Sequence, residues 1–211
     1  MTTKTLTYLF DPLCGWCYGA SPAIQKLGQH ATIRLALAPT GLFAGAGGRV
    51  MDAAFADYAW SNDVRIEKLT GQRFTEDYCT KILGQPGSRF DSATSTLALT
   101  AVALTVPQHE LDALKMLQEA RYIHALDTTA VPVVEKLLRD IGLDAAADRL
   151  AAGDTELLAA NAARIQKAQG LMQTFGAQGV PALVVTDENG SRLLRGNALY
   201  GSFDVLLSHI A

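Results

Sequence analysis

The stretch TYLFDPLCGWCYGASPAI, residues 7–24, places two cysteines two residues apart directly after an apolar run. The residues LTYLF (6–10) alternate and are rich in β-forming side chains, which predicts a strand. An Asp-Pro pair ends this strand, and the apolar spacing over residues 15–30 then predicts a helix. Cys14 is therefore expected at or just before a helix N-terminus, and Cys17 within the first turn of that helix.

The flanking sequence predicts further strands and a closing helix. TIRLALAP (32–39) reads as a second strand, so that residues 6–39 form one βαβ unit. Far along the chain, VPALVVTDENGSRLLRG (180–196) predicts a β-hairpin that turns at ENG. Residues 202–210 predict a last helix with Ser202 as its N-cap.

The middle of the chain is mostly helical. Helical spacing is found at residues 90–106, 108–126, 131–142 and 154–176. The resulting order is β-α-β, then a helical block, then β-β-α. A helical domain (41–175) inserted into a discontinuous α/β domain (1–40 and 176–211) explains this order better than two sequential domains do.

The composition excludes several classes of protein. The chain has 211 residues, of which 49% are apolar and 18% are charged, as in a compact protein with a large core and unlike a disordered one. A net charge of −3 gives no electrostatic reason to expect nucleic acid or an anionic membrane as a partner. The longest apolar-rich stretch, 97–106, falls short of the ~20 residues that span a bilayer and predicts a buried helix.

The N-terminal residues MTTKTLTYLF show neither an extended apolar region nor a small-residue cleavage site. We therefore expect a cytoplasmic protein. In that compartment thiols are normally kept reduced, and a disulfide is more often catalytic than structural.

A pair of cysteines at this spacing can bind zinc, form a structural disulfide or carry out redox chemistry. The other possible zinc ligands occur singly along the chain, at His30, Cys79, His109, His124 and His209. Four clustered ligands are needed for a structural zinc site, so we expect no metal. A disulfide over two residues closes almost no loop and constrains the unfolded chain little.

The redox interpretation has a physical basis at this position. A C-x-x-C motif that opens a helix in a βαβ unit is typical of redox proteins. The helix dipole and the free N–H groups of the first turn stabilise a thiolate at Cys14. Cys17, one turn deeper, is then placed to resolve a mixed disulfide.

Val180-Pro181 marks a second unusual position, at the start of the hairpin. Proline is tolerated there only at a strand start or edge, and its peptide bond can be cis or trans. A cis bond would turn the backbone of Val180 outward and offer its N–H and C=O groups to an extended peptide. Taken alone, the pattern favours a trans proline that merely starts a strand.

Together, Y-x-F-D-P-x-C-x-W-C-Y-G, the distant V-P and the large helical insert resemble the DsbA-like branch of the thioredoxin superfamily. The likeness is strongest to its cytosolic FrnE-like group, predicted protein-disulfide isomerases. The resemblance implies a thioredoxin-like α/β fold with a large helical insertion. It also implies that Cys14 is the nucleophile, Cys17 its resolving partner, and Val180-Pro181 a cis-proline loop facing both.

One departure from periplasmic DsbA bears on the direction of the reaction. The dipeptide between the cysteines is Gly15-Trp16 rather than Pro-His, so Cys14 lacks the histidine as a polar neighbour. We therefore expect a reduction potential near that of thioredoxin, roughly −270 mV, and not that of a strong oxidant.

The favoured function is a protein disulfide reductase or isomerase, acting on cysteine-containing proteins or on a thiol redox partner. We expect no resident cofactor, and glutathione is the candidate redox partner. The alternative is a small-molecule enzyme on the same fold, similar to the glutathione-dependent kappa transferases or the chromene-carboxylate isomerases. Those relatives typically present a serine where Cys14 stands and lack the second cysteine.

Three further residues have two interpretations each. Trp16 either forms part of a substrate-binding apolar surface or packs locally, and the sequence does not separate these roles. Asp11 either relays protons or caps the turn into the helix, and we favour the cap. Cys79 is more consistent with a small core residue than with a third redox thiol.

Overall fold

The computed structural model, which describes residues 4–211, brings the two ends of the chain into one sheet. Its strands are β1 (Lys4–Phe10), β2 (Ile33–Pro39), β5 (Ala182–Asp187) and β6 (Gly190–Arg195), in the order β2-β1-β5-β6. Strand β1 runs parallel to β2 and antiparallel to β5, and β5 pairs with β6 as a hairpin. The predicted βαβ unit and the predicted hairpin are both confirmed.

Helices make up most of the remaining chain. They are α1 (Gly15–Gly28), α2 (Ala53–Thr70), α3 (Glu76–Tyr78), α4 (Ala93–Thr105), α5 (Glu110–Tyr122), α6 (Val131–Asp140), α7 (Asp144–Ala152), α8 (Thr155–Phe175) and α9 (Phe203–Ile210). A π-helical turn, Cys79–Leu83, continues α3. A two-stranded ribbon, β3 (Arg49–Val50) with β4 (Arg89–Phe90), was not predicted from the sequence. The thioredoxin-like fold with a large helical insertion is confirmed.

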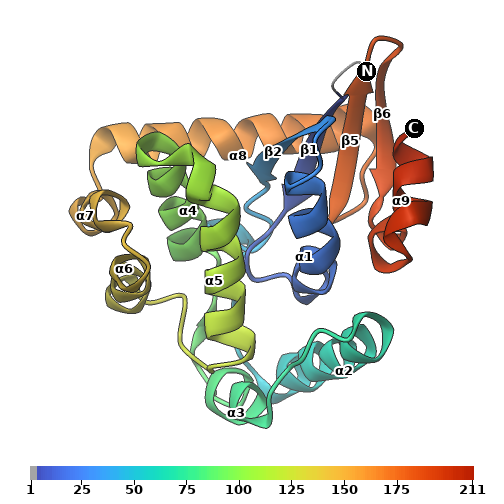
Figure 1. Cartoon of the computed structure of the whole chain (residues 1–211). Coiled ribbons are helices and arrows are strands. Elements are labelled where there is room, and N and C mark those ends of the chain that lie inside the picture. Colours follow the sequence, from blue (N-terminus) through green and yellow to red (C-terminus); the bar gives the residue numbers. More distant parts are fainter. Residues whose placement is uncertain (1–3) are drawn as a thin grey trace.

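Each face of the sheet is covered by helices, because the side chains of β1 alternate between two apolar layers. Leu6, Tyr8 and Phe10 pack in one cluster with α1 and α9, whereas Leu9 packs with Ala168 of α8 on the opposite face. Figure 1 shows the sheet with α1 and α9 on the right and helices α4 to α7 on the left. The site-bearing helix α1 is therefore held against the sheet along its length.

Helix α8 ties the helical block to the sheet and runs along the upper edge in Figure 1. Arg164 donates to Leu37 O at 3.3 Å and to Thr100 Oγ1 at 3.1 Å, and forms an ion pair with Glu110. Gln169 donates to Thr40 O at 3.0 Å, just after β2. One helix thus fixes the end of β2 against both α4 and α5.

The expected domain boundaries at residues 40/41 and 175/176 stay a prediction. Strand β2 ends at Pro39 and α8 ends at Phe175, next to these positions, but α8 also packs on the sheet. The first three residues of the expected segment 1–40 lie outside the described residues.

Several local predictions are met. Helix α4 is buried over most of its surface, as expected for 97–106. Ser202 caps α9, because its Oγ accepts a hydrogen bond from Val205 N at 3.4 Å. Helix α1 continues through Pro22 and ends at Gly28, two residues before the expected end.

Over residues 4–211, none of the helices has both the length and the apolar character needed to cross a membrane.

The turn between β1 and α1 is anchored by the buried carboxylate of Asp11. It accepts hydrogen bonds from Leu13 N at 2.9 Å, Phe43 N at 3.0 Å and Ser92 Oγ at 2.8 Å. Burial raises the pKa of Asp11, and these three hydrogen bonds oppose the rise. The favoured interpretation of Asp11 as a turn cap is confirmed, and the carboxylate also joins this turn to the segment after β2 and to the start of α4.

We expect Asp11→Ala to lower the free energy of unfolding by about 3–5 kcal/mol, because three donors lose their acceptor and two of them are backbone N–H groups. Ser92→Ala removes only one of the three hydrogen bonds and should cost about 1–2 kcal/mol. Urea unfolding followed by far-UV circular dichroism measures both. Equal losses in the two variants would contradict the anchoring role of Asp11.

Candidate active site

Cys14 occupies the N-cap position of α1, with an extended backbone (φ −83°, ψ 116°). Its N–H donates to Asp11 O at 3.1 Å, and its carbonyl accepts from Tyr18 N at 3.0 Å. The neighbouring carbonyl of Leu13 accepts from Tyr122 Oη at 2.9 Å, so α5 holds the same turn from the other side. The thiol therefore sits where the first-turn N–H groups of α1 favour negative charge.

The two cysteines differ in exposure. Both are free thiols; the exposed fraction is 7% for Cys14 and 1% for Cys17. Burial raises the pKa of Cys17 well above its usual value, and its hydrogen bond to the Cys14 sulfur adds to the rise. Cys14 is thus the more exposed of the two sulfurs, and Cys17 is the one whose burial favours the protonated thiol.

The start of the hairpin faces this pair. The Val180–Pro181 peptide bond is cis, and Cys14 Sγ donates to Val180 O over 3.7 Å. The pairing of β1 with β5 therefore brings Cys14 together with Val180, which lies 166 residues away in the chain, and with the adjacent Pro181.

Trp16 is partly buried, and it both packs against its neighbours and lines a pocket. Its ring lies 5.4 Å from the ring of Tyr200, and Tyr200 Oη donates to Trp16 O at 3.1 Å. The guanidinium of Arg65 lies 5.7 Å from the Trp16 ring centroid. The same side chain also lines the pocket beside Cys14, and its role in substrate binding stays a prediction.

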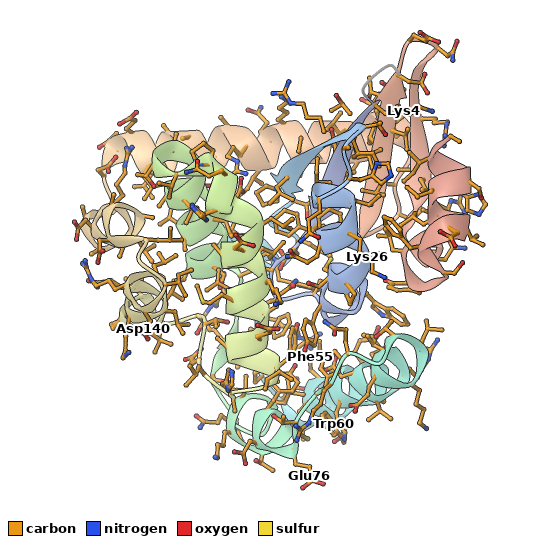
Figure 2. The ribbon with its side chains drawn as sticks, in the orientation of Figure 1. Lys4, Lys26, Phe55, Trp60, Glu76 and Asp140 are labelled. Carbon is orange, nitrogen blue, oxygen red and sulfur yellow. The ribbon has the colours of Figure 1, made fainter. Side chains whose placement is uncertain are left out.

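A pocket of about 410 Å³ opens beside Cys14, between the start of α1 and helix α2. Its walls are largely aromatic and apolar, with Arg49, Asn62 and Asp63 as the polar contributors among Leu13, Trp16, Phe43, Phe55, Tyr58, Ile66, Tyr78, Phe90 and Tyr122. Figure 2 shows α2, with Phe55 labelled, below the lower end of α1. Tyr58 is 65% exposed and flanks the opening.

Asp63 is a functional candidate that the sequence analysis did not identify. Its side chain is buried in the pocket, where Tyr78 Oη donates to Oδ2 at 3.2 Å. Burial raises the pKa of Asp63 to about 7, and the hydrogen bond from Tyr78 and the charge of Arg121 oppose the rise. A carboxyl group that titrates near neutrality therefore lies in the pocket that contains Cys14.

Gly15 permits this approach of Asp63. A Cβ atom at position 15 would clash with Asp63 Oδ1, so any residue other than glycine at this position would displace the carboxyl group. Only the glycine in the C-G-W-C motif hints at this contact in the sequence.

The absence of a metal and the role of Cys79 both stay predictions. Within the part of the chain that the structure describes, no three His, Cys, Asp or Glu residues are grouped to hold a metal ion. Cys79 lies in the π-helical turn and is partly exposed, so the expectation of a core position is met only in part.

The comparisons with known proteins agree with this geometry. A sequence model of the DSBA-like thioredoxin domain family matches residues 5–210. A search of curated protein sequences gave no match.

Solved structures similar to the chain include the cytosolic disulfide reductase DsbM of Pseudomonas aeruginosa. It is 28% identical, with a TM-score of 0.85, over 98% of this chain and 96% of DsbM. DsbM with glutathione gives 29% identity and a TM-score of 0.83 over the same shares. A proposed protein disulfide isomerase of Nitrosomonas europaea shares the fold, at 22% identity and a TM-score of 0.78 over 99% of this chain and 100% of its own.

The raised pKa of Asp63 predicts a pH-dependent stability. Between pH 4 and pH 7 the folded chain holds a proton on Asp63 that the unfolded chain has lost, so the free energy of unfolding falls as pH rises across this window. A shift from 3.8 to about 7 corresponds to roughly 4 kcal/mol in total. Urea unfolding at pH 4–8 should show this slope in the wild type relative to Asp63→Asn. Parallel curves would contradict the raised pKa.

Proposed function

The chain belongs to the DSBA-like thioredoxin domain family, and from this premise we propose that it is a cytoplasmic disulfide reductase that uses Cys14 as the attacking thiol and Cys17 as the resolving thiol. The observation that carries the proposal is the position of Cys14, at the N-terminus of α1 and 3.7 Å from Val180 O beside the cis Pro181. The burial of Cys17 behind Cys14 supports the division of roles.

In the proposed reaction, an extended substrate segment lies along the backbone of Val180, with Trp16 forming part of the apolar surface around it. The Cys14 thiolate attacks one sulfur of the substrate disulfide, the substrate S–S bond breaks, and the leaving sulfur takes up a proton. Cys17 then loses its proton and attacks Cys14 Sγ. The substrate leaves as a dithiol, and the two electrons it gained come from the Cys14 and Cys17 thiols, which are oxidised to a disulfide.

The burial of Cys17 gives this order its physical basis. Because burial raises the pKa of Cys17, that sulfur stays a thiol while Cys14 reacts first. Proximity then makes its attack on the mixed disulfide intramolecular, which favours release of the substrate over a lasting mixed disulfide.

Two observations support the reducing direction. The dipeptide Gly15-Trp16 places no cationic side chain between the cysteines. DsbM of Pseudomonas aeruginosa is described as a cytosolic disulfide reductase, and one of its structures contains glutathione. We therefore infer that glutathione, or a thiol of similar size, returns the Cys14–Cys17 pair to the dithiol. Isomerase activity would use the same first step on a misfolded substrate.

The pocket beside Cys14 favours a second candidate function. Its volume of about 410 Å³ and its aromatic walls suit a small apolar electrophile, as in a kappa-transferase-like or chromene-carboxylate-isomerase-like enzyme. The presence of both Cys14 and Cys17 favours the reductase. Conjugation of glutathione to 1-chloro-2,4-dinitrobenzene, without reduction of insulin, would support the second candidate instead.

Single-cysteine variants test the proposed roles. Cys14→Ser should abolish glutathione-coupled reduction of insulin, because the reachable sulfur is lost. Cys17→Ser should accumulate mixed disulfides with insulin chains, visible on non-reducing gels and by mass spectrometry. Cys79→Ser, outside the pair, is the matched control and should keep wild-type turnover. Trapping by Cys14→Ser rather than by Cys17→Ser would reverse the assignment.

Equilibration with glutathione buffers measures the direction of the reaction. We expect a potential of about −270 mV for the Cys14–Cys17 pair, close to thioredoxin, because the dipeptide Gly15-Trp16 places no cationic side chain between the cysteines. A value above about −150 mV, near the DsbA end of the range, would show that the protein is built to oxidise.

A further inference from the structure

Asp63 occupies a position from which it can act on the sulfur chemistry. It extends from α2 into the pocket that also contains Cys14, and its Oδ1 lies against Gly15, the residue that follows Cys14. Tyr78 Oη donates to Oδ2, and within residues 4–211 no hydrogen bond to Oδ1 is found. One oxygen is therefore fixed in place, and the other faces the start of α1.

The groups around Asp63 leave its carboxyl group able to change charge. Those that face it are Cys14 before α1, Arg49 of β3, Tyr78 and Cys79 of the α3 segment, and Arg121 and Tyr122 of α5. Arg121 is 2% exposed, and its guanidinium lies 5.6 Å from the Tyr78 ring centroid. Arg49 pairs with Asp52 at 3.9 Å. Among the described residues, no cation forms a salt bridge with Asp63.

Asp11, the other buried carboxyl group near the cysteines, does not offer the same chemistry. Its two oxygens already accept three hydrogen bonds, from Leu13 N, Phe43 N and Ser92 Oγ. Its exposed fraction is 0%, and it does not line the pocket. Asp63 lines the pocket and Asp11 does not, so Asp63 is the carboxyl group that a thiol entering the pocket would meet.

We propose that Asp63 accepts the proton of the thiol that enters this pocket to reduce the Cys14–Cys17 disulfide, and returns a proton to a thiolate that leaves by the same route. The inference rests on the proposed reductase function and adds to it the group that handles the proton of the reducing thiol.

The proposed step moves one proton to Asp63 and one electron pair to the Cys17 sulfur. The proton of the incoming thiol moves to the Asp63 carboxylate as its sulfur forms a bond to Cys14 Sγ. The Cys14–Cys17 bond breaks, its electron pair goes to the Cys17 sulfur, and Cys17 takes up a proton from solvent. The thiol is oxidised to a mixed disulfide with Cys14, and Cys17 is reduced. Asp63 later releases its proton to solvent, or to a thiolate that leaves the pocket.

The acidity of Asp63 fits this task. Burial raises its pKa to about 7, so near neutral pH the carboxylate and the carboxylic acid are both populated. A general base of this kind is most effective when its pKa lies near the working pH. The hydrogen bond from Tyr78 Oη lowers the pKa of Asp63. Removing this hydroxyl should therefore raise the pKa, which gives a test of the proposed role of Asp63.

The test follows the reduction of the oxidised protein by glutathione in stopped flow, between pH 5.5 and 8.5. In the wild type the rate constant, corrected for the thiolate fraction of glutathione, should show an inflection near pH 7. Asp63→Asn should remove this inflection and lower the rate at pH 8 by about tenfold or more. Asp57→Asn, an exposed carboxylate on the same helix, is the matched control and should keep the wild-type profile.

A second variant separates proton transfer from a structural effect. Tyr78→Phe keeps the ring but removes the hydrogen bond to Oδ2, so the inflection should move to higher pH while the protein stays folded by circular dichroism. Profiles of Asp63→Asn and Tyr78→Phe that both match the wild type would overturn the proposal and leave the reductase function standing. Failure of both glutathione and dithiothreitol to reduce the wild-type protein would overturn both.

Discussion

The site depends on a turn that is held from both sides. Asp11 fixes the residues between β1 and α1 to the segment after β2 and to the start of α4, while Tyr122 of α5 holds the carbonyl of Leu13. Burying the Asp11 carboxylate without these hydrogen bonds would destabilise the folded protein. The turn before α1 therefore depends on the segments that supply the donors, and those segments depend on Asp11. These contacts hold Cys14 at the N-cap of α1.

The helical insertion supplies much of the wall of the candidate active site. The sheet, α1 and the cis Pro181 supply the sulfur pair and a backbone facing it. The pocket walls beyond α1 come mainly from α2 and the segment 43–49, with Tyr78, Phe90 and Tyr122. Gly15 joins the two parts, since the missing Cβ lets α2 bring Asp63 against the first turn of α1. The dipeptide Gly15-Trp16 therefore has two effects in this chain. It places no charged side chain between the cysteines, and its glycine lets α2 pack closely against the start of α1.

The sequence predicts those parts of the fold whose signals are local. Strands β1, β2, β5 and β6 follow from alternation and turn residues, and the long helices follow from their spacing. Helix α2 was not among the predicted helices, because its apolar residues are interspersed with polar ones and only Asp63 and Ile66 are fully buried in the fold. From the sequence alone, Asp63 would be taken for a solvent-exposed carboxylate, because charged and polar residues surround it in the chain. Its burial follows from contacts with Gly15 and Tyr78 that no local pattern encodes.

The arrangement around Asp63 explains how a carboxyl group can remain titratable in a buried site. A direct ion pair with Arg121 would hold the carboxylate charged at neutral pH, because a close opposite charge lowers an acid's pKa by one to three units, roughly. Tyr78 instead provides the hydrogen bond, and the Arg121 guanidinium lies against the ring of Tyr78. The cation thus acts on Asp63 from a distance and only partly offsets the effect of burial. A neutral hydrogen-bond donor between the two charges keeps both protonation states of the carboxyl group accessible beside Cys14.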